Sequence, residues 1–264
     1  MMSRVAHAPG VPCSQSCEHS CPVEKRRSHE CERGTHKCVR HDMHNELIAF
    51  LRLQQFADSA LPIGGAAHSF GLESLTDAGL LTTDGLESFL ADYLAEAGVL
   101  EASYCARSAE LPALDCWFRW NLDLGARKVA RESRDASAAM GRRFLDLAAR
   151  LSGSELLQKA IEQNREVHLA ACFGLTAGAL GAEPEMAAAF FLQQSIATLI
   201  SCCQRLLPLG QTRAHEILWR LKPAILHAAR RGAETQPHTV FTFTPLLDVA
   251  SARHPGLHTR LFIS

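Results

Sequence analysis

The sequence predicts an all-α fold: a single-domain helical bundle with a central apolar helix hairpin and a flexible C-terminal tail. Aromatic residues make up only 6% of the 264 residues, while alanine and leucine, which suit closely packed helices, are plentiful. Apolar side chains recur at i, i+3, i+4, i+7 and i+8, the spacing of one helical face, in Leu86, Phe89, Leu90, Tyr93 and Leu94. A long apolar stretch over residues 169–204 supplies the predicted hairpin.

Composition divides the chain into three segments. Residues 1–44 form a Cys/His-rich arm, residues 45–234 a helical body, and residues 235–264 a C-terminal partner-binding segment. The net charge of −1 gives no overall field that favours nucleic acid or an anionic membrane. Residues 1–42 contain no Leu, Ile or Phe from which to build the apolar core of a secretory signal, so we expect a cytoplasmic protein.

The arm carries the candidate metal ligands. It has too little apolar surface to offset the entropy of ordering, so we expect it to be disordered by itself. Its thiols and histidines suit zinc, nickel or cuprous ions. An alternative is that the working protein does not need this extension, because composition changes sharply at Met43. The candidate ligands are Cys13, Cys17, Cys21, Cys31 and Cys38.

A bend separates the first two predicted helices of the body. The amphipathic segment 46–57 is stopped by Pro62 and the pair Gly64-Gly65, since proline lacks an N–H and paired glycines favour turns. A second helical pattern starts near Ala66 and closes at Gly79. It is predicted to carry three polar side chains on neighbouring faces of its first turns, those of His68, Ser69 and Glu73.

Ser69 also permits a hydrolase hypothesis. The residues around it, 67–71, mimic a nucleophile elbow, and Asp248 and His254 follow in the order of that family of hydrolases. An elbow needs a strand directly before the serine, and this chain has Pro62 and two glycines there. We therefore expect Ser69 to be inert and the chain to have no catalytic residue.

Further helices follow in order. One begins near Pro112, carries Trp117 and Phe118, and is predicted to break at Gly125. Residues 126–152 form a charged helix whose ion pairs give a solvated face, with a docking face for a partner as the alternative. Gly141 lies midway along this helix, where glycine is costly, and therefore indicates a close helix approach.

The apolar hairpin divides at Gly181 and Pro184. Its first helix contains Gly174-x₃-Gly178, which would let a neighbouring backbone approach closely. Its second is uncharged over residues 186–204, long enough for a membrane span, but polar side chains interrupt it, among them Gln193, Gln194, Ser195 and Ser201. We expect a buried core or dimer helix there.

The last thirty residues differ in pattern from the helical body. After the break at residues 208–211, a helix restarts at Pro223 and is predicted to end at Gly232. Residues 240–244 have an extended pattern, residues 246–253 suit a short helix, and the terminus is rich in Leu, Phe and Arg. Such a terminus indicates a segment that folds against another surface.

Six blocks lie in the order 61–73, 132–141, 168, 208–211, 247–254 and 260–262. Together they resemble the UreF family of urease accessory proteins, over about residues 46–264. Ala66 departs from the family, which usually has an aromatic residue there, and the arm has no counterpart. Residues that match the family's motifs are Pro62, Gly64, Gly65, His68, Ser69, Gly71, Glu73, Arg134, Gly141, His168, Pro208, Gly210 and Gln211. Of these, His168 is expected to be a core histidine with satisfied hydrogen bonds and not a metal ligand.

The resemblance implies a non-catalytic, all-α homodimer. Proteins of this family join UreD (also called UreH) and the GTPase UreG to apo-urease, and the assembly delivers nickel as cargo to a carbamylated-lysine site. No cofactor of its own is implied. We expect residues 255–264 to be mobile in the free protein and to become ordered on UreD. The residues implied in partner binding are Asp248, Arg253, His254, Arg260, Leu261 and Phe262. A chaperone that stores metal through the arm remains an alternative.

Overall fold

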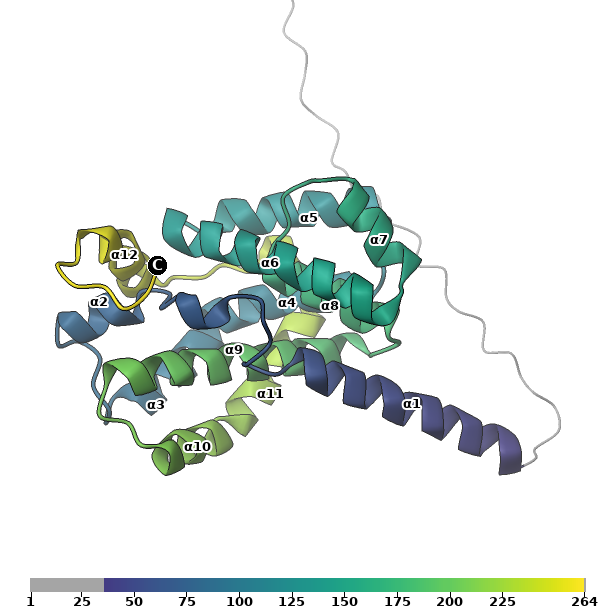
Figure 1. Cartoon of the computed structure of the whole chain (residues 1–264), viewed down its shortest axis with the longest axis horizontal. Coiled ribbons are helices and arrows are strands. Elements are labelled where there is room, and N and C mark those ends of the chain that lie inside the picture. The colour runs from purple at the N-terminus through teal and green to yellow at the C-terminus, as the bar shows by residue number, and fades with distance from the viewer. Residues whose placement is uncertain (1–35, 264) are drawn as a thin grey trace, which may run out of the picture.

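The computed structural model describes residues 36–263, and the side chains of residues 44–263. These residues form one all-α body, and no strand occurs among them (Figure 1). Short 3₁₀ turns lie at Gly65–Ala67 (η1), Pro237–Thr239 (η3) and His254–Gly256 (η4), and a π-helical turn at Leu94–Gly98 (η2). The α-helices are α1 (His36–Phe56), α2 (Leu72–Asp77), α3 (Leu86–Tyr93), α4 (Val99–Ala109), α5 (Leu114–Arg127), α6 (Arg131–Ser152), α7 (Glu155–Glu162), α8 (Leu169–Ala179), α9 (Pro184–Leu206), α10 (Gln211–Arg220), α11 (Lys222–Glu234) and α12 (Pro245–Arg253).

The predicted apolar hairpin is α8 and α9, and it shares the centre of the body with α4. Helix α4 packs against α8, α9 and α11, and nine of its eleven residues are buried. A Cβ on Gly174 would overlap the carbonyl oxygen of Cys105, and one on Gly178 that of Ala109. The two glycines therefore let the backbones of α4 and α8 touch, as their spacing predicts.

Helix α9 is long and apolar enough to cross a membrane, and it alone passes that test among the described residues. However, 56% of its most apolar window is buried inside the protein. That burial is typical of a core helix, in agreement with the interpretation made from its polar interruptions.

Two helices continue past glycines that were predicted to end them. Helix α5 passes Gly125 and ends at Arg127, and α11 passes Gly232 and ends at Glu234. A Cβ on Gly125 would lie 2.6 Å from Nε2 of His168, and one on Gly232 2.5 Å from Cβ of Ala102. Both glycines allow close packing within a helix, so the prediction of a break was wrong. The charged helix α6 correspondingly starts at Arg131, after a turn.

The first helix begins earlier than the predicted boundary of the arm at residue 44. Helix α1 starts at His36, so Cys38 lies on a helix, while Cys13, Cys17, Cys21 and Cys31 are outside the described residues. The described part of α1 contacts α9, where the Phe50 and Phe190 rings meet edge to face with 5.4 Å between their centroids. Its N-terminal half projects away from the body (Figure 1).

Candidate functional site

The bend before α2 is a loop with three left-handed residues. Gly64 has φ +89°, Phe70 φ +53° and Gly71 φ +87°, and Gly71 directly precedes α2. His68 is extended, with φ −121°. The prediction that His68 and Ser69 share a helix with Glu73 was therefore wrong, because the left-handed pair at 70 and 71 turns the chain just before the helix begins. Only Glu73 lies on α2.

Glu73 is the polar centre of this region. It is 5% exposed, and both carboxylate oxygens accept hydrogen bonds from the end of the chain. Oε1 accepts from the backbone N–H of Leu261 at 2.6 Å, and Oε2 from that of Phe262 at 3.3 Å. Oε2 also lies 2.7 Å from Nε2 of the buried His254, and because a carboxylate can only accept, Nε2 is the donor. One buried carboxylate thus holds three donors of residues 254–262.

Arg205 of α9 fastens the same segment from the other side. Its guanidinium donates to the carbonyl oxygens of Ala66, at 2.8 Å, and Leu261, at 3.3 Å. The guanidinium also stacks over the Phe262 ring, 4.2 Å from its centroid. The backbone N–H of Ile263 donates to the carbonyl oxygen of Ala67 at 2.8 Å, so the bend and the end of the chain lie side by side.

The described end of the chain is therefore docked on its own body, contrary to the prediction of a free tail. Phe262 is only 5% exposed, and Glu73 and Arg205 satisfy the backbone groups around it. The prediction from composition failed because the surface that receives Phe262 comes from loop 64–71 and α9, which are remote in sequence. We call residues 254–263 the docked segment.

The six predicted partner-binding residues divide into two groups. His254 and Phe262 are buried and hold the docked segment in place, while Asp248 is half-buried and accepts a hydrogen bond from the Thr244 hydroxyl at 3.3 Å. The other three are exposed and face away from the body: Arg253, Arg260 and Leu261.

Gly71 joins this site to two further helices. A Cβ at Gly71 would lie 2.8 Å from Oγ of Ser251 on α12, so only glycine fits both the positive φ and the close contact. The Ser133 hydroxyl of α6 donates to Ser251 Oγ at 3.1 Å. The bend therefore sets the position of α12, whose C-terminal end leads into the docked segment.

The remaining residues of the family motifs lie at other contacts between helices and turns. Arg134 donates to the Lys128 carbonyl at 3.1 Å and closes the turn between α5 and α6, and a Cβ on Gly141 would lie 2.7 Å from the Val167 carbonyl oxygen. The latter contact confirms the close approach predicted for α6. At the bend, Pro62 is exposed, Gly64 lies against the Arg143 guanidinium, and Gly65 is buried. Exposed residues of the turn before α10 complete the set: Pro208, Gly210 and Gln211.

His168 is fully buried as predicted, but its ring is not satisfied by hydrogen bonds. Its backbone N–H donates to Asn121 Oδ1 at 2.7 Å, while neither ring nitrogen has a hydrogen-bond partner within the described residues. Nε2 lies 3.5 Å from a Glu166 carboxylate oxygen. Burial, reinforced by the charges of Lys128 and Arg134, lowers the pKa of His168 from 6.5 to about 4.

This shift predicts a loss of stability in acid. Below pH 6.5 the unfolded chain protonates His168, whereas the folded protein does not until about pH 4. The neutral His168 ring therefore leaves the free energy of unfolding at its full value above pH 6.5, and this free energy declines as the pH falls from 6.5 to 4. The free energy of unfolding should fall by about 2 kcal/mol more between pH ~7 and ~5 in the wild type than in His168→Gln. Chemical denaturation at both pH values measures this. His227→Gln, at an exposed position on α11, is the control and should keep the wild-type slope.

No group of three or more potential metal ligands gathers among the described residues. Burial raises the pKa of Cys202 and of Cys203 to about 12. These thiols stay protonated at neutral pH, whereas a metal ligand must be a thiolate. The candidate ligands Cys13, Cys17, Cys21 and Cys31 lie in the part of the chain that the structure does not describe.

Ser69 lacks the surroundings of a nucleophile. Its side chain is fully buried, and Oγ has no hydrogen-bond partner within residues 44–263. His254, the base of the hydrolase hypothesis, instead donates to Glu73. Among the described residues, the geometry places no hydrogen-bonded base at the Ser69 hydroxyl.

Comparison with known proteins agrees with the resemblance. The family model UreF matches residues 80–222. A urease accessory protein UreF of Nostoc sp. strain PCC 7120 is 31% identical over 222 residues, which cover 81% of this chain and 96% of that protein. One from Bradyrhizobium sp. strain ORS 278 is 31% identical over 224 residues, 83% of this chain and 93% of the relative. The chain therefore belongs to the UreF family of urease accessory proteins, which act in urease maturation.

Proposed function

We propose that the chain is a non-catalytic scaffold that joins UreD (UreH) and the GTPase UreG to apo-urease in the cytoplasm. In this proposal nickel is the cargo that the assembly delivers to urease, and the chain needs no cofactor of its own. Membership of the UreF family supports a role in urease maturation. The observation that carries the scaffold role is the docked segment, which buries His254 and Phe262 and leaves Arg260 and Leu261 exposed, next to the exposed Arg253 at the end of α12.

The docked segment suits recognition because its shape is fixed before a partner arrives. Ordering a free residue costs roughly 1–2 kcal/mol of backbone entropy, and a preorganised segment avoids that cost on binding. Arg260 and Arg253 offer guanidinium groups for paired hydrogen bonds to carboxylates, and Leu261 adds apolar area. UreD is the proposed occupant of this surface.

Co-purification tests this function. The full-length chain mixed with a UreD homologue should form a complex that elutes as one species and then recruits UreG. A chain lacking residues 255–264 should fail at the first step while retaining its helical circular dichroism. A truncated chain that still binds UreD with full affinity would show that the docked segment is not the docking element.

We further propose that the chain pairs with a second copy through α1 and the start of α9. Leu47, Phe50 and Leu51 of α1 are 42–58% exposed, and Met186 of α9 is 42% exposed. Phe50 contacts Phe190 of α9, and the side chains of Leu47, Phe50 and Met186 border a hollow between α1 and the turn before α9. Large apolar side chains that are exposed close to one another in this way suit a subunit interface.

The double variant Leu47→Lys with Leu51→Lys is expected to convert a dimer into a monomer, because two buried ammonium groups would lack partners in the interface. Light scattering after size exclusion measures the mass. Leu122→Lys, an equally exposed leucine on α5, is the matched control and should leave the dimer intact. A wild-type chain that is monomeric at all concentrations, or a double variant that stays dimeric, would contradict the proposed interface.

A further inference from the structure

A cavity of about 120 Å³ lies between α6, α9, the bend and the segment that leads into α12. Its walls are largely apolar, with Phe70, Met140, Leu169 and Phe191 among the lining residues. The volume is of the same order as the roughly 150 Å³ engineered cavity that binds benzene. It can therefore hold a single-ring molecule.

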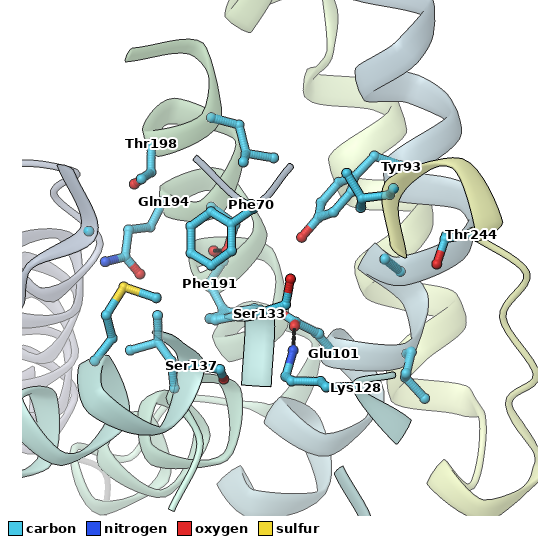
Figure 2. A pocket seen from close by; sticks show the side chains of 18 of the residues that line it. Phe70, Tyr93, Glu101, Lys128, Ser133, Ser137, Phe191, Gln194, Thr198 and Thr244 are labelled. Atoms are coloured by element: carbon cyan, nitrogen blue, oxygen red, sulfur yellow. Dashed lines mark hydrogen bonds and ion pairs between the residues drawn. The ribbon is translucent and has the colours of Figure 1, made fainter. Parts of the chain in front are cut away.

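One wall contains an unsatisfied hydrogen-bond acceptor. Gln194 of α9 lines the cavity and is 4% exposed, and its Oε1 has no hydrogen-bond partner within the described residues. A buried polar atom without a partner loses the hydrogen bond that it makes with water in the unfolded chain, so a donor at this position would be stabilising. The Tyr93 hydroxyl provides a second polar group on another side of the cavity (Figure 2).

The charges around the cavity are mostly neutralised by their neighbours. Lys128 pairs with Glu101 at the cavity wall (Figure 2). Arg127 pairs with Asp123 at 3.2 Å and donates to the Val240 carbonyl at 2.9 Å. The other polar lining groups are mostly uncharged hydroxyls, such as those of Ser137 and Thr198, and the Asp248 carboxylate accepts a hydrogen bond from the Thr244 hydroxyl at 3.3 Å. An uncharged molecule fits these surroundings better than an anion or a cation.

We propose that this cavity binds a small uncharged molecule with an apolar ring and one hydrogen-bond donor, and that the donor meets Gln194. The site is independent of the scaffold function. It also borders the segment that precedes the docked segment, because Thr242, Thr244 and Leu247 line it. A bound molecule would thus contact the chain that leads into α12.

Phenol is a suitable probe because it is a neutral ring with one O–H donor, and toluene matches its shape without the donor. The full chain carries five methionines, and Met140 lines the cavity, whereas Met186 lies outside it, in the proposed interface between two copies. Methyl-labelled methionine therefore reports binding by NMR at a known place. Phenol should shift the Met140 methyl signal saturably and leave Met186 unchanged.

Phenol should bind about fivefold more tightly than toluene, the effect of one hydrogen bond of about 1 kcal/mol. Gln194→Leu should abolish or reverse this preference, and Gln158→Leu, the same change at an exposed position on α7, should preserve it. Toluene binding in the wild type and in Gln194→Leu shows whether the cavity itself survives the change. An unshifted Met140 signal with both probes would mean that the cavity holds only water and would overturn the proposal. A phenol preference that Gln194→Leu leaves intact would overturn it equally.

Discussion

Glu73→Gln is expected to release the docked segment. The substitution keeps the shape of the side chain but replaces one acceptor oxygen with an NH₂ group, which faces N–H donors from His254, Leu261 or Phe262. Hydrogen bonds to charged groups contribute about 1.5–3 kcal/mol each, so amide protection at Leu261 and Phe262 should fall by about 10- to 100-fold. Hydrogen exchange followed by mass spectrometry or NMR measures this local opening.

Asp77→Asn is the matched control for this experiment, because Asp77 is the exposed last residue of the same helix. It should leave the protection of the docked segment unchanged. If UreD binds the docked form, its apparent affinity for Glu73→Gln should weaken by the factor by which the docked fraction declines. Unchanged protection of residues 261 and 262 would show that Glu73 does not hold the segment.

Arg260→Ala is expected to give the opposite combination of results. Arg260 is exposed and forms no ion pair within the described residues, so its loss should leave the docked segment protected. UreD binding should nevertheless weaken by about 2 kcal/mol or more, roughly 30-fold, if the guanidinium pairs with a carboxylate that becomes buried in the complex. Affinity measured by calorimetry, beside hydrogen exchange of the free protein, separates the two effects.

Arg213→Ala supplies the control, because Arg213 is an exposed arginine on α10, outside the docked segment. It should bind UreD as the wild type does. Full UreD affinity in Arg260→Ala would remove Arg260 from the proposed interface. Lost protection of the docked segment in that variant would mean that Arg260 acts inside the chain and not on the partner.

Regular helices were predictable because their information is local. Apolar periodicity over residues 86–94 located α3, and the pair Gly181 and Pro184 located the turn between α8 and α9. The spacing of Gly174 and Gly178 also predicted a close approach, since a missing side chain every fourth residue opens one face of a helix. At Gly125 and Gly232, by contrast, glycine led to the wrong prediction of a helix end, because there it allows close packing inside a continuous helix.

The sequence named several residues that meet at the candidate site, but it gave neither Arg205, which lies remote on α9, nor their arrangement. The sequence alone determined an all-α chain of the UreF type and named Glu73, His254, Arg260 and Phe262 among its significant residues. Only the tertiary structure decided that Glu73 receives donors from residues nearly 190 positions later, with hydrogen-bond separations of 181, 188 and 189. Composition cannot show that a terminus rich in Leu, Phe and Arg docks on its own chain, because the complementary surface is built from Arg205, loop 64–71 and α2. Burial of Phe262 and satisfaction of its backbone N–H depend on those remote elements meeting, and this meeting exists only once the helices have packed.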